Sequence, residues 1–243
     1  MAVVTQKLIA ENRTQLPKLQ ILIYPWIQMI NLKLPSHIKY FNTGLLSSFS
    51  SSPGKFIAWY LGIQNLTDQI ETIINTNLHY TLIDNHNNNE IKLKINKYLD
   101  INRIDKQFRS KEYYNDYDTI KKYNYKLDKL DDDHLLKTDT NLANLLLKLY
   151  SPEISPILAD DLSKQPNAYF AICEWDTLKD EGLLYAERLK SSGVQVVDID
   201  VYEDAYHGIW AFPSDPNKSN LLSGYKVANK MVENIENFIR KNL

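Results

Sequence analysis

The last third of the sequence alternates between two kinds of segment, and this alternation restricts the fold more than any other feature. Apolar runs predict buried strands and amphipathic stretches predict helices, in the order strand, helix, strand, helix, at residues 168–173, 181–192, 195–202 and 220–242. Two strands joined by a helix in one sheet form a right-handed crossover with parallel strands. A further apolar run at residues 19–24, ended by Pro25, predicts another buried strand. The sequence therefore predicts an α/β fold with a parallel sheet flanked by helices.

Residue types at the ends of the predicted helices indicate where these helices begin and stop. We expect Asp180 to cap the N-terminus of the helix at residues 181–192, and Gly193 to follow its last turn. The helix predicted for residues 1–10 has no capping residue before it. We therefore expect this first helix to be an interior element of a longer domain.

A carboxylate and a histidine follow the two strands of the last third. Asp176 comes just after the strand at residues 168–173, and His207 just after the strand at residues 195–202. Because functional groups gather beyond the carboxyl ends of parallel strands, we expect both side chains at one edge of the sheet. There Asp176 can accept a hydrogen bond from one ring nitrogen of His207, as the acid of a hydrolytic triad does. The alternative is that Asp176 caps a turn and His207 is an ordinary loop histidine.

The sequence lacks the first member of such a triad. A triad serine is expected on a Gly-x-Ser-x-Gly turn upstream of the acid and the histidine, and the sequence contains no such pattern. Five serines precede Pro53 without a strand–turn–helix frame and are interpreted as a polar loop: Ser47, Ser48, Ser50, Ser51 and Ser52. We therefore predict that this chain contains no nucleophile.

The sequence predicts no metal site and no cofactor. The run from Asp131 to His134 is interpreted as a solvated charged stretch rather than a set of metal ligands. The single cysteine, Cys173, lies in an apolar strand pattern, so we expect a buried structural thiol. Glycine is scarce, at 7 residues, which argues against a glycine-rich loop for phosphate or oxyanion binding.

Composition excludes several classes of partner. The net charge is −2 with 24% charged residues, so no basic surface for nucleic acid is expected. The sequence has no secretory signal and no run of about 18 apolar residues, the length that spans a bilayer. The oligomeric state stays open at this level.

Ordered motifs in the last third resemble the C-terminal part of one enzyme family. The strongest are residues 173–186 (Cys-Glu-Trp-Asp-Thr-Leu-Lys-Asp-Glu-Gly-Leu-Leu-Tyr-Ala) and 203–208 (Glu-Asp-Ala-Tyr-His-Gly), supported by 158–162 and 189–194. They resemble the arylacetamide deacetylases and neutral cholesterol ester hydrolases, in the hormone-sensitive-lipase-like branch of the α/β-hydrolases. Near the N-terminus, residues 4–8 resemble the helix that follows the family's Gly-Asp-Ser-Ala-Gly-Gly turn.

The resemblance implies an α/β-hydrolase domain over residues 1–243. Residues 1–64 and 141–243 are family-like, whereas 65–140 would be a divergent, partly disordered insertion on the lid side. It implies that Asp176 is the triad acid and His207 the general base, with apolar esters or arylacetamides as substrates of a full-length parent. The family's nucleophilic serine, His-Gly-Gly oxyanion motif and endoplasmic-reticulum membrane anchor lie upstream of the position that matches Met1.

Two interpretations of the chain follow. In the first, the chain is part of a carboxylic-ester serine hydrolase of lipid metabolism, through a gene fragment, an incomplete gene model or an internal start, and is inactive alone. In the second, it is a complete pseudoenzyme that keeps the scaffold as a binding or interaction module. A coding sequence upstream of Met1 that contains the serine turn would decide for the first, and a stop codon and promoter there for the second.

Overall fold

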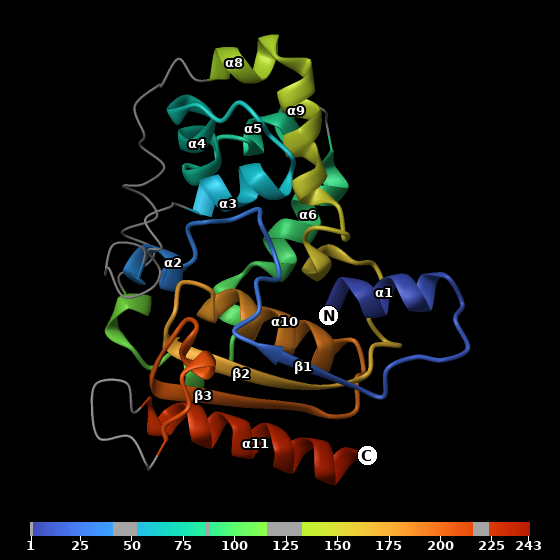
Figure 1. Cartoon of the computed structure of the whole chain (residues 1–243). Coiled ribbons are helices and arrows are strands. Elements are labelled where there is room, and N and C mark those ends of the chain that lie inside the picture. Colours follow the sequence, from blue (N-terminus) through green and yellow to red (C-terminus); the bar gives the residue numbers. More distant parts are fainter. Residues whose placement is uncertain (1, 41–52, 86–87, 116–132, 216–223) are drawn as a thin grey trace.

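The computed structural model describes residues 2–40, 53–85, 88–115, 133–215 and 224–243. Its sheet has three parallel strands in the spatial order β1, β2, β3, with the bounds Leu19–Ile23, Asn167–Trp175 and Val197–Tyr206 (Figure 1). Leu22 of β1 lies opposite Phe170 of β2, which lies opposite Ile199 of β3. The predicted parallel sheet is confirmed, and its strands lie where the apolar runs placed them.

Helices cover both faces of the central strand, β2. On one face lies α11 (Lys226–Asn242) (Figure 1). Its Met231 and Phe238 form an apolar cluster with Tyr169 of β2. On the other face, α10 (Lys179–Ser191) places the ring of Tyr185 edge-on to Phe170, with ring centroids 6.2 Å apart. Burial on both faces explains why β2 is apolar without alternation, as parallel strands are.

The remaining helices form a layer on the α10 side of the sheet (Figure 1). Their bounds are α1 Ala2–Ala10, α2 Pro35–Tyr40, α3 Pro53–Tyr60, α4 Asp68–Asn75, α5 Tyr80–Asn85, α6 Asn89–Tyr98, α8 Asp133–Thr138 and α9 Thr140–Leu147. In α4, Thr67 caps the first turn and Ile70, Ile73 and Ile74 are buried on one side. Parts of residues 65–140 are thus helical, and the division into family-like and divergent segments stays a prediction. No helix in the described ranges is long and apolar enough to cross a membrane.

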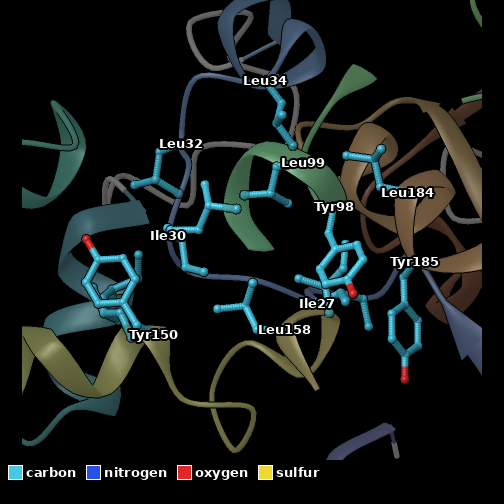
Figure 2. Packing of buried hydrophobic residues seen from close by; sticks show 14 of the residues in the cluster. Ile27, Ile30, Leu32, Leu34, Tyr98, Leu99, Tyr150, Leu158, Leu184 and Tyr185 are labelled. Carbon is cyan, nitrogen blue, oxygen red and sulfur yellow. The ribbon is translucent and has the colours of Figure 1, made fainter. Parts of the chain in front are cut away.

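The segment between β1 and α2 is anchored by its apolar side chains. Ile27, Ile30, Leu32 and Leu34 are all buried in the main core. Figure 2 shows these side chains in one cluster with Tyr98, Leu99, Tyr150, Leu158, Leu184 and Tyr185. Burying a side chain of this size contributes about 1.5–3 kcal/mol. The burial therefore fixes the path of the chain that leads to α2, whose first residues contact the turn after β2.

The start of α10 corrects one prediction. The helix begins at Lys179 with Leu178 at the N-cap position, so the prediction that Asp180 caps it is wrong. Asp180 is instead fully buried and accepts hydrogen bonds from the backbone amide of Ser36 at 2.7 Å and from the hydroxyl of Tyr114 at 2.5 Å. At the other end of the helix, Gly193 has φ +90°, the left-handed conformation expected after a last turn.

Candidate active site

Asp176 begins the turn that connects β2 to α10. Its Oδ1 atom accepts a hydrogen bond from the backbone amide of Leu178 at 2.8 Å, as in turns where an aspartate holds the backbone two residues on. Its other oxygen, Oδ2, lies 2.9 Å from Nδ1 of His207. Asp176 is only 1% exposed, so its carboxylate is shielded from water. The turn holds one oxygen and leaves the other for His207.

His207 follows β3 directly, and 36% of its side chain is exposed. The next residue, Gly208, has φ +90°, which lets the chain turn from the strand into a single-turn helix, Ile209–Ala211. Trp175 at the end of β2 lies opposite Tyr206 at the end of β3. The structure therefore brings Asp176 and His207 together at one edge of the sheet, and their catalytic roles stay a prediction.

The surroundings of His207 determine its protonation. Burial disfavours the imidazolium, but the hydrogen bond and the charge of Asp176 favour it more, so the pKa of His207 lies above its ordinary value. When the neutral ring donates its Nδ1 proton to Asp176, Nε2 keeps a lone pair. Within the described ranges, Asp176 is the hydrogen-bond partner found for His207, through Nδ1. The neutral ring can therefore accept a proton at Nε2.

A pocket of about 340 Å³ opens beside His207. Aromatic, aliphatic and proline side chains make up most of its wall, together with two histidines and a threonine: Ile23, Tyr24, Pro25, Trp26, His37, Pro53, Phe56, Thr177, Leu178 and His207. A mostly apolar concave wall with a few polar groups is typical of small-molecule sites. An apolar ligand group in this pocket would lie next to the imidazole.

Tyr24 packs against His207, a contact that the sequence analysis missed. The two ring centroids are 4.6 Å apart, with an interplanar angle of 55°. Tyr24 directly follows β1 and precedes Pro25, so it lies at the same edge of the sheet as Asp176 and His207. That position, an aromatic residue between a buried strand and a proline, was the signal in the sequence.

A polar network supports the Asp176 turn from behind. The hydroxyl of Ser36 in α2 donates to the carbonyl of Thr177 at 2.8 Å and accepts from the amide of Asp180 at 3.2 Å. A buried ion pair joins Lys179 Nζ to Glu174 Oε2 at 2.7 Å, with both side chains at most 3% exposed. Buried hydrogen bonds and a buried ion pair therefore hold residues before and after Asp176, and this restricts the movement of the turn.

His37 lies in the pocket wall next to another buried carboxylate, that of Glu181. Its side chain is 2% exposed, and its Nε2 atom lies 3.7 Å from Oε2 of Glu181. Burial lowers the pKa of His37 to about 4, so the ring is neutral near pH 7. Burial raises the pKa of Glu181, although the backbone amide of Ile27 and the amides of Gln28 donate hydrogen bonds to it. The pocket therefore contains one neutral, buried histidine besides His207.

The other candidates from the sequence do not join this site. Ser47, Ser48, Ser50, Ser51 and Ser52, and with them Asp131 and Asp132, lie outside the described residues, and His134 is exposed on α8. Cys173 is fully buried, and burial raises the pKa of its thiol, as expected for a structural cysteine. Within the described ranges, no group of three or more histidine, cysteine, aspartate or glutamate side chains could hold a metal ion.

Comparisons with known proteins show what this chain is similar to. A model for the α/β-hydrolase fold matches residues 115–211, a range that contains both Asp176 and His207. Bovine arylacetamide deacetylase (Bos taurus) is 38% identical over 118 residues, which cover 45% of this chain and 26% of the relative. Neutral cholesterol ester hydrolase 1 of Rattus norvegicus is 29% identical over 205 residues, which cover 82% of this chain and 42% of the relative.

A solved structure gives the same fold. An esterase of Pyrobaculum calidifontis superposes with a TM-score of 0.50 at 18% identity, over 96% of this chain and 46% of that protein. The chain thus spans less than half the length of the proteins it matches here. These matches confirm the resemblance inferred from the motifs: the chain has an α/β-hydrolase fold and is similar to part of the arylacetamide deacetylases and neutral cholesterol ester hydrolases.

Proposed function

We propose that Asp176 and His207 are the acid and the general base of a carboxylic-ester hydrolase site. The observation that supports this most is the 2.9 Å contact between Asp176 Oδ2 and His207 Nδ1, made by a buried carboxylate and a partly exposed imidazole. The acid holds the ring in one tautomer and stabilises the imidazolium that forms when Nε2 takes a proton. His207 also lines the mostly apolar pocket.

In such a site the imidazole activates a serine. Nε2 takes the proton of the serine hydroxyl while the oxygen attacks the ester carbonyl, and the same proton then passes to the leaving alcohol, which leaves an acyl-serine that water hydrolyses. The sequence has no Gly-x-Ser-x-Gly turn to present that serine. We therefore propose that this polypeptide provides the acid and the base and, by itself, does not hydrolyse esters.

The substrate class follows from the pocket and from the relatives. The wall next to His207 is mostly apolar and includes Trp26 and Phe56, which suits an apolar or aromatic acyl group. The names of the relatives, arylacetamide deacetylase and neutral cholesterol ester hydrolase, indicate arylacetamides and lipid esters. We propose carboxylic esters or amides of apolar acyl groups as the substrates of the complete site.

Titration of His207 by NMR tests the proposed pair. In Asp176→Asn the side chain keeps a similar shape but loses its negative charge, so we expect the pKa of His207 to fall below its wild-type value. Glu203→Gln is the matched control, because Glu203 lies in β3, the strand that leads to His207, but its side chain is 63% exposed and pairs with Lys111. A His207 pKa that is equal in wild type and Asp176→Asn would show that the two groups are not a functional pair.

The alternative function is non-catalytic binding on a hydrolase scaffold, which agrees equally with the missing serine turn. The apolar pocket would then hold a ligand without turnover. Binding of phenylacetate or butyrate, measured by shifts of the His207 ring signals, would be the same under both proposals. The two differ only in whether a coding sequence with the serine turn precedes Met1.

A further inference from the structure

The backbone of Tyr24 has an unusual conformation at the end of β1. Its φ is +33°, in the left-handed region that non-glycine residues rarely adopt. The following residue, Pro25, disfavours helical conformations of the residue before it and adds to the cost. The amide of Tyr24 donates a hydrogen bond to the carbonyl of Ala171 at 2.7 Å, which keeps the residue tied to β2. Such strain persists where the surrounding structure requires one side-chain direction.

That direction places the tyrosine ring against the imidazole of His207. The centroids are 4.6 Å apart, and both rings line the same pocket. The ring is uncharged near neutral pH, because burial and then the negative charge of Asp176 raise the pKa of the Tyr24 hydroxyl. The contact is therefore between an aromatic ring and an imidazole, and not an ion pair.

His207 needs such a neighbour because one hydrogen bond does not fix a ring. The bond from Nδ1 to Asp176 sets the position of one atom, but the imidazole can still swing about that contact. His207 is also 36% exposed, so part of its ring has no packed neighbour. A ring packed at 4.6 Å blocks this swing, and its π electrons attract the positive charge of an imidazolium.

We propose that Tyr24 is a positioning residue that holds the His207 ring in the plane in which Nδ1 stays on Asp176 and Nε2 stays open to the pocket. The inference rests on the proposed function, since it assigns Tyr24 a role in the same acid–base pair. The titratable groups that face His207 within the described ranges are Asp176 from the β2–α10 turn and Tyr24 from β1, and His37 of α2 lines the same pocket.

Two substitutions at Tyr24 separate the ring from the hydroxyl. Tyr24→Phe keeps the ring, and Tyr24→Leu removes it. Neither is glycine, so both must adopt the same left-handed backbone and bear the same strain. We expect Tyr24→Leu to lower the pKa of His207 and to speed exchange of its Nδ1 proton with water. The expected change is about two- to fivefold, which corresponds to the loss of one cation–π contact at a partly exposed site. Tyr24→Phe keeps both wild-type values.

Three results would overturn the inference. One is a Tyr24→Leu protein with the wild-type pKa and exchange rate of His207, another is a Tyr24→Phe protein that changes as much as Tyr24→Leu, and the third is a rise in the pKa. If Tyr24→Leu does not fold, as judged by its amide NMR spectrum, Tyr24→Met provides the same comparison. Asp176→Asn, measured alongside, separates the two proposals: no change of His207 in that variant refutes the pair itself, whereas a change there but none in Tyr24→Leu refutes only the role of Tyr24.

Discussion

Buried His79 should make the folded chain sensitive to mild acid. This histidine is 0% exposed, and its Nε2 atom lies 3.0 Å from the carbonyl of Ile30. Burial lowers its pKa to about 4, although the carbonyls of Ile30 and Ile73 favour the charged ring and oppose that shift. Because its folded pKa is depressed, the unfolded chain takes up the proton first as the pH falls from about 6.5 to 4. The stability that His79 provides is therefore present above this window and lost within it.

The size of the effect follows from the two pKa values. With about 6.5 for the unfolded chain and about 4 for the folded chain, linkage gives a loss of about 2 kcal/mol in the free energy of unfolding between pH 7 and pH 5. Replacing His79 by a side chain that does not titrate removes this loss. His79→Gln can still donate a hydrogen bond to Ile30, whereas His79→Phe fills the space but leaves the Ile30 carbonyl unpaired, at a cost of about 1–3 kcal/mol at every pH.

Urea unfolding at pH 7 and pH 5, followed by circular dichroism, measures these differences. We expect both variants to lose about 2 kcal/mol less than the wild type between the two pH values, with His79→Gln the more stable variant at pH 7. His134→Gln, at an exposed position of α8, is the control and should keep the wild-type pH dependence. If His79→Gln loses as much stability as the wild type, His79 is not a neutral, buried histidine, and the reasoning fails.

Two substitutions near the Asp176 turn should destabilise the fold for different reasons. Lys179→Met removes the cation from buried Glu174, which we expect to cost about 3–5 kcal/mol, whereas Lys190→Met at an exposed pair should cost about 1 kcal/mol or less; equal values from urea unfolding would contradict this. In Gly182→Ala, the new Cβ would meet Cδ1 of Ile172 at 2.6 Å, so we expect a loss of about 1–3 kcal/mol. Ile172→Val deletes that carbon, and the double variant should recover part of the loss; if the two costs only add, the clash is not the cause.

Local patterns in the sequence were sufficient to predict the sheet and the meeting of Asp176 with His207. The strands are apolar runs because both faces of the sheet are covered, and parallel strands bring their carboxyl ends to one edge. A residue directly after such a strand therefore lies at that edge, whatever contacts its side chain then makes. Asp176 and His207 therefore needed no knowledge of distant parts of the chain.

Contacts between distant segments could not be predicted in this way. Asp180 resembles a helix cap, but Tyr114 and Ser36, both far away in the sequence, surround it and draw it into the core. Tyr24 adopts a left-handed backbone although its residue type and the following Pro25 disfavour it, because packing against His207 and bonding to β2 override local preference. Both misses arise where tertiary contacts outweigh short-range rules.

Hydrolysis of p-nitrophenyl butyrate by the purified chain tests most directly whether the acid and the base are present without their nucleophile. Removing a triad serine leaves only the modest catalysis that the oxyanion hole and binding supply. We predict that the wild-type chain releases p-nitrophenol no faster than the His207→Ala and Asp176→Asn variants, although His207 in the wild type titrates as a partner of Asp176. Turnover by the wild type that disappears in His207→Ala would contradict this, because it would show that the chain already contains a nucleophile.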